Sequence, residues 1–307
     1  MQTTLRFAKV RRKMTNLSSS TSFLMQRSGI QESFLTVFLM ARILTLSSMK
    51  KLTNKFFKYY SSNLCVNLSK EFTELSEREW TSKNFTFATA VSVMSSSRIE
   101  GETLEIDSYV KHKVLDIEYL PNLTEKPNDL YKAYEFARDN KLTANNFLQA
   151  HSLATKHLLP ASQRGVVRKG NMLVMEQKTN RVQYEAANSF IVQSEYESFW
   201  QELSELIEED MSIEEIFYYA SLIHLVFVNI HPFNDGNGRT ARLLEKWFLA
   251  SILGNKAWFI PSENYYYQNL SDYYANLARV GLFYDELDYE KGLPFLLMLP
   301  KALYVNK

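Results

Sequence analysis

Residues 212–254 read SIEEIFYYASLIHLVFVNIHPFNDGNGRTARLLEKWFLASILG, and this stretch decides the fold. It opens with a capping box, in which Ser212 is placed to cap a helix and Glu215 follows three positions later. The helix predicted over 213–229 is apolar on nearly every side, and such a helix lies at the centre of a protein. A second helix of this kind is predicted over 238–253. We therefore expect two buried central helices joined by a short polar loop.

The composition indicates a mostly α fold. The 307 residues include only 9 glycines and 7 prolines, whereas sandwiches and barrels use these residues at every turn. A hydrophobic content of 46% and a charged content of 22% are typical of a soluble globular protein with a substantial core. The net charge of +1 favours neither nucleic acid nor acidic partners, so we expect no nucleic-acid partner. The single cysteine, Cys65, is interpreted as a core residue rather than a nucleophile.

The rest of the chain is expected to be helical apart from one hairpin. Apolar spacing predicts further helices over 83–100, 128–140 and 143–158. Short apolar runs on either side of a polar break predict a β-hairpin over 172–184, and Val166-Val167 is a further strand-like run. We divide the chain into a helical or irregular region (1–80), a main domain (81–280) and a helical tail (281–307).

The N-terminal segment has an unusual charge balance. The first 50 residues carry eight Lys or Arg and one acid, Glu32, and they are rich in serine. This resembles an organelle transit peptide, but the interpretation that we prefer is a loosely packed arm. The apolar run from Phe34 to Met40 stops before Arg42 and is far shorter than a membrane span of roughly 20 residues. We therefore expect a cytoplasmic protein with no membrane partner.

The loop between the two central helices carries residues suited to binding an anion. Pro232 moves His231 out of helical geometry, and the imidazole could then act as a general base. Phe233 is a large apolar residue in a polar loop, and it can anchor the loop by burying its ring. The run 235–238 contains two glycines, which allow successive backbone N–H groups to converge at a helix N-terminus. Such a nest is an anion site.

Charged residues on either side of this nest point to a polyphosphate. Arg239 and Arg242 are three positions apart and project from one face of the second helix. Two guanidinium groups suit a polyphosphate better than a single carboxylate. Asp235 adds an oxygen ligand for Mg²⁺, which usually arrives with substrate phosphates. The groups that in-line transfer at phosphorus requires are thus present within twelve residues.

Other interpretations of the loop are weaker. Gly236 to Ala241 fits the dinucleotide pattern G-x-G-x-x-A, but that motif follows a strand, and here a buried helix precedes it. An ordinary surface loop accounts for any one of these residues but not for all of them. His224 is predicted to be a hydrogen-bonded core histidine rather than a metal ligand.

The run from His231 to Arg242 resembles the Fic-family signature H-x-F-x-[DE]-G-N-G-R-x-x-R. The match includes His231, Phe233, Asp235, Gly236, Asn237, Gly238, Arg239 and Arg242. The resemblance covers about 85–275 and implies a Fic-type helical bundle with one small hairpin. It implies a protein adenylyltransferase, which transfers AMP from ATP to a Ser, Thr or Tyr hydroxyl of a target protein.

The resemblance also implies the role of each residue. His231 is the base, Asp235 the Mg²⁺ ligand, Gly236, Asn237 and Gly238 the phosphate cradle, and Arg239 and Arg242 the polyphosphate clamps. The related kinase-like branch replaces the Asp-Gly-Asn-Gly portion, and its presence here favours AMP transfer. The hairpin at 172–184 takes the place of the family's flap, which binds the target by strand addition. Relatives often have Tyr followed by prolines there, whereas this chain has Tyr184-Glu185-Ala186-Ala187, so an ordinary surface hairpin stays an open alternative.

A second motif lies about 140 positions upstream. Ser96, Glu100 and Gly101 resemble the family's inhibitory-helix motif [ST]-x-x-x-E-[GN], and the first two are four apart on one helix face. The resemblance implies that Glu100 pairs with Arg242 in place of the ATP γ-phosphate. A charge-assisted bond of about 1.5–3 kcal/mol would reduce productive binding by about one or two orders of magnitude. The alternative is a helix end capped by Gly101 with a solvated glutamate.

Two other functions stay open on the sequence alone. One is a de-AMPylase, in which Glu100 positions the attacking water. The other is a catalytically silent nucleotide-binding module that regulates a partner. A DNA-binding role is disfavoured because no basic helix stripe follows the motif. The sequence allows a homodimer and does not identify the target protein.

Overall fold

The computed structural model describes residues 50–304, apart from positions 78, 80 and 176–181. Residues 50–307 form one unit, and the predictions made for 1–49 lie outside the described residues. In the described part of the chain the fold is mostly helical, and its strands form a single two-stranded sheet. The mostly α fold with one small hairpin is confirmed.

The helices follow one another along the chain with short connections. They are α3 (Phe57–Ser62), α4 (Leu68–Ser76), α5 (Ser82–Ile99), α6 (Ile106–Leu115), α7 (Pro121–Asp139), α8 (Ala144–Ala154), α9 (Val192–Ile207), α10 (Ile213–Ile230), α11 (Asn237–Leu253), α12 (Ser262–Gln268), α13 (Leu270–Ala278), α14 (Leu293–Leu296) and α15 (Met298–Ala302). Short 3₁₀ turns lie at Ala161–Gln163, Asn255–Phe259, Tyr284–Glu286 and Tyr289–Gly292. The strands are β1 (Leu173–Met175) and β2 (Val182–Glu185).

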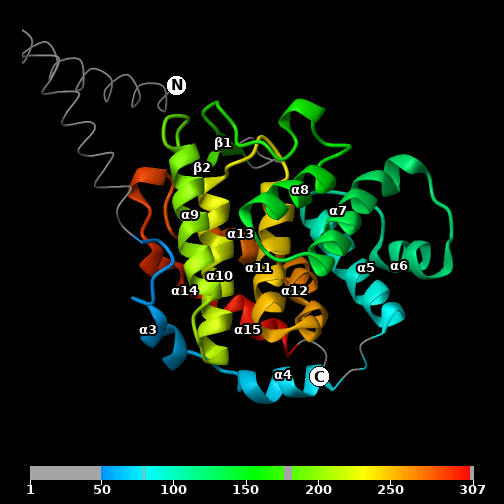
Figure 1. Cartoon of the computed structure of the whole chain (residues 1–307), viewed down its shortest axis with the longest axis horizontal. Coiled ribbons are helices and arrows are strands. Elements are labelled where there is room, and N and C mark those ends of the chain that lie inside the picture. The colour runs from blue at the N-terminus through cyan, green and yellow to red at the C-terminus, as the bar shows by residue number, and fades with distance from the viewer. Residues whose placement is uncertain (1–49, 78, 80, 176–181, 305–307) are drawn as a thin grey trace, which may run out of the picture. The chain divides into compact units, whose positions relative to one another are not determined.

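The predicted pair of central helices is α10 and α11, which pack against each other in the middle of the unit (Figure 1). The predicted capping box starts α10: Glu215 N donates to Ser212 Oγ at 3.3 Å, and Ser212 N donates to Glu215 Oε2 at 2.9 Å. Every residue from Ile216 to Ile230 is buried. By length and hydropathy α10 could cross a membrane, but 83% of that window is buried inside the fold, as in a core helix. The apolar surface of α10 is therefore buried against other parts of the fold.

A buried polar network connects four helices around α11. Lys246 Nζ on α11 forms an ion pair with Glu263 of α12 and donates to Ser92 Oγ of α5 at 2.7 Å. Tyr134 OH of α7 donates to Glu263 Oε1 at 2.6 Å. Burial opposes ionisation of Glu263, but the charge of Lys246 together with the hydrogen bonds from Lys246 and Tyr134 outweighs burial and lowers the pKa of the carboxyl group. The network thereby bonds α5, α7 and α12 to α11, and its two buried charges, on Lys246 and Glu263, neutralise each other.

The hairpin lies at one end of α9 and α10 (Figure 1). Its strands are antiparallel, with Leu173 opposite Glu185 and Val174 opposite Tyr184. The outer edge of β2 contacts the C-terminal part of the chain, because Glu185 N donates to Leu282 O at 2.7 Å. Residues far apart in sequence therefore meet at this hairpin.

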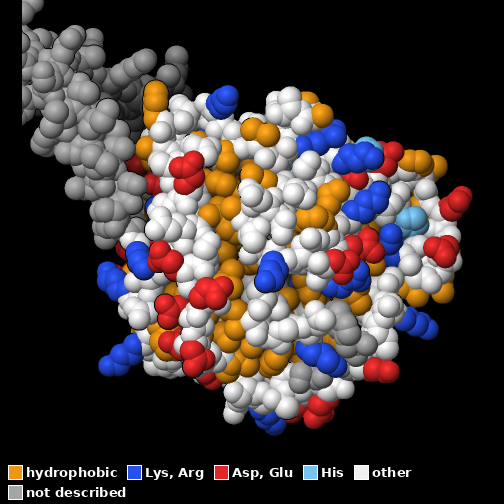
Figure 2. All heavy atoms as spheres, viewed as in Figure 1, with side chains coloured by type: hydrophobic (Ala, Val, Ile, Leu, Met, Phe, Trp, Pro, Cys, Tyr) orange, Lys and Arg blue, Asp and Glu red, His pale blue; other side chains and the backbone are white. Residues whose placement is uncertain are grey.

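Figure 2 shows acidic side chains gathered along α9, with hydrophobic side chains beside them. The helix is two-sided: Phe199 and Leu203 are buried, whereas Glu197 and Glu205 are exposed. Its apolar face packs against α10 and its acidic face meets solvent.

Three details differ from the sequence predictions. The helix predicted to start at residue 128 starts at Pro121 as α7, so Pro127 lies inside it. Pro121 suits the first turn, where its missing N–H costs no bond, and the burial of Pro127 offsets the bond lost further along. Val166-Val167 is not a strand. Cys65 is exposed rather than buried, because it lies between α3 and α4.

Candidate active site

His231 ends α10 and begins the loop that leads to α11. Its backbone is left-handed, with φ 50° and ψ 59°, and its N–H donates to Phe227 O at 3.0 Å. Pro232 cannot continue the helix, so the chain turns at this point, as the sequence predicts. The left-handed backbone itself was not predicted and is uncommon for a residue other than glycine.

The imidazole ring of His231 is contacted on its Nδ1 side. Val228 O lies 3.2 Å from Nδ1, and Tyr184 OH lies 2.8 Å from the same atom. Burial lowers the pKa of His231 to about 4. The ring is therefore neutral at pH 7, which is the form that can accept a proton.

The loop is held in one shape by Phe233 and Asn237. Phe233 is fully buried, as expected of an anchor, and its ring lies among those of Phe147, Tyr196 and Phe227. Asn237 Nδ2 donates to Phe233 O at 2.8 Å, and Phe233 N donates to Asn237 Oδ1 at 2.9 Å. The Asn237 side chain thus holds the loop, and its backbone N–H is the group that it can offer to a phosphate.

His151 of α8 supports the loop through its ring, a role that was not predicted from the sequence. Its ring stacks on that of Phe233 at 3.7 Å between centroids. Gly165 N donates to His151 Nδ1 at 2.8 Å, so Nε2 carries the hydrogen and donates to Asp235 O at 2.9 Å. Burial lowers the pKa of His151 to about 4, which keeps this arrangement neutral. A single histidine in a helical segment carried no sequence signal of this role.

Two glycines of the motif allow close approaches that a side chain would prevent. Gly236 has φ 80°, and a Cβ added there would lie 2.6 Å from Thr155 Cγ2. A Cβ on Gly238 would collide with the Glu100 carboxylate. These glycines therefore leave the first turn of α11 open to an anion.

Arg242 is the best-bound residue of the motif. It is 1% exposed and donates to Ser96 Oγ at 2.8 Å, to Ser96 O at 3.2 Å and to Tyr273 OH at 3.1 Å. Its Nη2 donates to Glu100 Oε1 at 2.6 Å. Ser96 and Glu100 therefore both contact Arg242 in the structure. Glu100 lies 142 positions before Arg242 in the sequence. Gly101 follows with φ 91° and ends the helix.

Glu100 is held as a carboxylate. Burial opposes its ionisation, but the charges of Arg242 and Arg239, together with the hydrogen bond from Arg242, outweigh burial and lower the pKa of Glu100. An anionic group of the protein itself thus lies at the first turn of α11.

Arg239 also meets an acid, which the sequence analysis did not single out. Its Nη2 lies 3.6 Å from Glu102 Oε1, and Lys126 Nζ donates to the same oxygen at 2.9 Å. Arg239 is 5% exposed, and within the described residues its Nε has no hydrogen-bond partner. The segment that follows α5 therefore places one acid beside each arginine of the motif.

Asp235 is the exposed residue of the loop that could bind a metal ion. Gly236 N donates to Asp235 Oδ1 at 2.6 Å. Among the described residues no three His, Cys, Asp or Glu side chains are grouped to hold a metal. The donors fit a Mg²⁺ ion that shares one carboxylate with the phosphates of a nucleotide.

The remaining histidine of α10 has the role predicted for it. His224 is fully buried, 2.8 Å from Glu245 Oε2 through Nδ1 and 3.0 Å from Tyr273 OH through Nε2. It is a core histidine.

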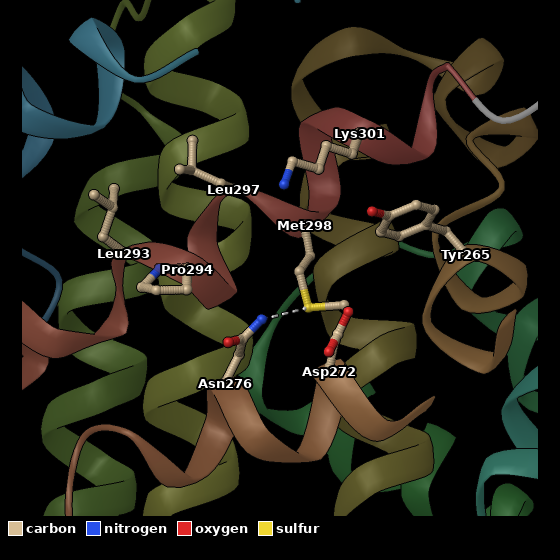
Figure 3. A pocket seen from close by; sticks show the side chains of 8 residues that line it. All are labelled: Tyr265, Asp272, Asn276, Leu293, Pro294, Leu297, Met298 and Lys301. Atoms are coloured by element: carbon tan, nitrogen blue, oxygen red, sulfur yellow. Dashed lines mark hydrogen bonds between the residues drawn. The ribbon is translucent and has the colours of Figure 1, made fainter. Parts of the chain in front are cut away.

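A separate pocket of about 230 Å³ lies between α12 and α13 on one side and α14 and α15 on the other (Figure 3). Lys301 and Asp272 border it, and Asn276 Nδ2 contacts Met298 Sδ at 3.5 Å. No residue of 231–242 lines it. It is therefore distinct from the site at the start of α11.

Comparison with known proteins identifies the class of this chain. Residues 141–249 match the Fic/DOC family, a span that includes the whole loop and most of α11. Residues 141–249 of the chain therefore form a Fic domain. Proteins of this family are commonly transferases.

The chain is similar to several relatives. It is 42% identical over 76 residues to a protein adenylyltransferase Fic from Nematostella vectensis, over 25% of this chain and 16% of that protein. The match thus spans about a sixth of the relative's length. It is also similar to a Fic-family protein of Desulfovibrio desulfuricans, with a TM-score of 0.63 and 22% identity over 77% of this chain and 70% of the other. A Fic-domain signalling protein of Bacteroides thetaiotaomicron gives a TM-score of 0.58 at 19% identity, covering 77% and 94%. These structures establish the fold.

Proposed function

We propose that the chain is a protein adenylyltransferase that transfers AMP from ATP to a hydroxyl of a target protein, and that Glu100 inhibits it. One observation carries the proposal: a carboxylate of the protein lies at the first turn of α11 against Arg242. A place that accepts this anion beside two arginines is suited to the terminal phosphates of ATP. The relative from Nematostella vectensis, named a protein adenylyltransferase, supports this donor and acceptor.

The proposed reaction is an in-line displacement at the α-phosphorus. The hydroxyl oxygen of the target forms a bond to phosphorus, the bond from phosphorus to the bridging oxygen breaks, and pyrophosphate leaves. The hydroxyl proton passes to His231, which is neutral at pH 7. Asp235 would hold Mg²⁺, which neutralises phosphate charge when the nucleotide is bound. Arg239 and Arg242 would bind the terminal phosphates once Glu100 has moved.

The Glu100–Arg242 contact sets the basal activity in this proposal. A charge-assisted bond of about 1.5–3 kcal/mol reduces productive ATP binding by about tenfold to hundredfold. Productive binding is reduced but not abolished. The protein as encoded is thus expected to be mostly inactive.

The test is transfer of label from ATP labelled at the α-phosphate, with Mg²⁺ and a cell lysate as the source of targets. Glu100→Gly should label proteins more strongly than the parent, and ATP labelled at the γ-phosphate should give no labelling above background. Glu118→Gly, which changes an exposed glutamate outside the helices, is the matched control. Equal or weaker labelling by Glu100→Gly would count decisively against inhibition by this residue.

The role of His231 is tested in the Glu100→Gly background. His231→Ala should bind ATP with unchanged affinity and transfer no AMP, because it lacks the base. Transfer at the rate of the single variant would exclude His231 as the base.

A further inference from the structure

The hairpin contributes a residue to the ring of His231. Tyr184 lies on β2, opposite Val174, and its side chain is only 8% exposed. Its hydroxyl donates to Val228 O at 2.9 Å and lies 2.8 Å from His231 Nδ1. The two rings meet edge to face at 5.9 Å between centroids. The hydroxyl is therefore placed between the last turn of α10 and the imidazole.

This arrangement selects one tautomer of His231. Val228 O is 3.2 Å from Nδ1 and can only accept a hydrogen bond. If Nδ1 carries the hydrogen, it donates to the carbonyl and to the Tyr184 oxygen, whose own hydrogen points to Val228. If Nε2 carries it instead, the lone pair on Nδ1 faces the lone pairs of the carbonyl. In the first arrangement the Val228 carbonyl, the Tyr184 hydroxyl and Nδ1 of His231 each have a hydrogen-bond partner, and Nε2 is left unprotonated.

Arg168 fixes the backbone of the same residues. It is 3% exposed, and its Nε donates to His231 O at 2.7 Å, while its backbone N–H donates to Pro232 O at 2.8 Å. Its guanidinium also donates to Gly170 O at 2.5 Å and to Ala187 O. Gly170 precedes β1 and Ala187 follows β2, so one side chain joins both ends of the hairpin to the histidine. The ring and the hairpin are therefore held in a fixed relation.

We propose that Tyr184 is a positioning residue, which holds His231 in the Nδ1–H tautomer so that Nε2 takes the proton of the target hydroxyl. This inference rests on the proposed function. It makes the base dependent on the hairpin, because any displacement of β2 withdraws the hydroxyl from Nδ1. The orientation of the base is thereby coupled to the position of the hairpin.

The first experiment measures transfer kinetics in the Glu100→Gly background. Tyr184→Phe removes the hydroxyl and keeps the ring, and the rate at saturating ATP should fall about five- to tenfold, as expected for one lost hydrogen bond to the base. The KM for ATP should stay unchanged, because the hydroxyl of Tyr184 bonds to Val228 and His231 rather than to the arginines of the phosphate site. Tyr218→Phe is the matched control, since Tyr218 OH donates to Thr53 O at 2.8 Å, away from the motif, and should keep the full rate.

The second experiment reads the tautomer directly by long-range ¹H–¹⁵N NMR of the histidine rings in the full chain, with His231→Ala to assign the signals. The Glu100→Gly protein should show His231 as the Nδ1–H tautomer. Tyr184→Phe should increase the Nε2–H form, because Nδ1–H loses its nearer acceptor, the Tyr184 oxygen at 2.8 Å, and keeps only Val228 O at 3.2 Å. An unchanged tautomer in Tyr184→Phe overturns the inference whether or not the rate falls, and so does an unchanged rate. If Glu100→Gly transfers no AMP, the proposed function fails, and the NMR result alone decides whether Tyr184 sets the tautomer.

Discussion

Replacing Glu100 by glutamine separates charge from shape in the proposed inhibition. Glutamine has nearly the same size as glutamate and keeps an oxygen that can accept the hydrogen bond that Arg242 donates at 2.6 Å. It loses the negative charge. A charge-assisted bond contributes about 1.5–3 kcal/mol and a neutral one about 0.5–1.5 kcal/mol, a difference of about 1–1.5 kcal/mol. Productive ATP binding should therefore improve about five- to tenfold in Glu100→Gln.

Glu100→Gly should improve binding further, to about tenfold to hundredfold over the parent, since it removes the whole bond. The same substitution leaves Arg242 with Ser96 and Tyr273 as partners, at 2.8 and 3.1 Å. Loss of the charged partner should destabilise the unliganded protein by about 1–3 kcal/mol, which lowers Tm by about 2–6 °C. ATP should restore this loss, because its phosphate oxygens replace the carboxylate.

The assay is the KM for ATP in the labelling reaction, with calorimetric titration of ATP and Mg²⁺ as a second measurement. The order of productive binding should be parent, then Glu100→Gln, then Glu100→Gly, with Glu118→Gln equal to the parent. If Glu100→Gln is as inhibited as the parent while Glu100→Gly is active, Glu100 blocks the site by its bulk, and the electrostatic reasoning is refuted.

The pH profile of the Glu100→Gly variant should be flat from about pH 6 to 8, because burial holds the pKa of His231 at about 4, whereas a histidine titrating near 6.5 would make the rate rise over this range. Adding Glu102→Gln to Glu100→Gly should tighten ATP binding by a further factor of about two to five, because a partly buried ion pair at 3.6 Å with Arg239 is removed. If titration calorimetry shows that the double variant binds ATP no more tightly than Glu100→Gly, this prediction is wrong. Glu263→Gln should lower the free energy of unfolding in urea by about 3–5 kcal/mol, because a buried ion pair loses one charge. Because the folded pKa of Glu263 is lowered, its contribution is present above the unfolded value of about 4.5 and is lost as the pH falls, so the difference between variant and parent should shrink in acid.

The predictions that held were those in which local pattern and burial agree. The capping box at Ser212 and the apolar run behind it specify α10 without any long-range information. The break at Pro232 follows from covalent geometry. Motif spacing also placed Ser96 and Glu100 on one helix face, and the resemblance to the Fic family implied the pairing of Glu100 with Arg242, which the structure shows as a contact at 2.6 Å.

What the sequence could not provide depends on contacts between distant segments. His151, Glu102 and Arg168 stand among ordinary residues, and only the packing of α8, of the segment after α5 and of the hairpin brings them to the motif. The start of α7 was predicted seven residues too late, because a buried proline such as Pro127 can stay within a helix when tertiary packing offsets the lost bond. Cys65 was misjudged because its residue type, rather than its position in a loop, was used to predict burial.

The bond from Lys246 to Ser92 limits how the proposed inhibition can be relieved. Ser92 lies on α5 eight residues before Glu100, about 12 Å along the helix, and it is attached to the buried pair that joins α11 and α12. Moving α5 away as a rigid body would take the Ser92 hydroxyl from the buried Lys246 ammonium group, at a cost of about 1.5–3 kcal/mol for this bond alone. A rotation about the side-chain torsions of Glu100 leaves that network intact. In the proposed mechanism, activation therefore requires only a rotamer change of Glu100 at the end of α5.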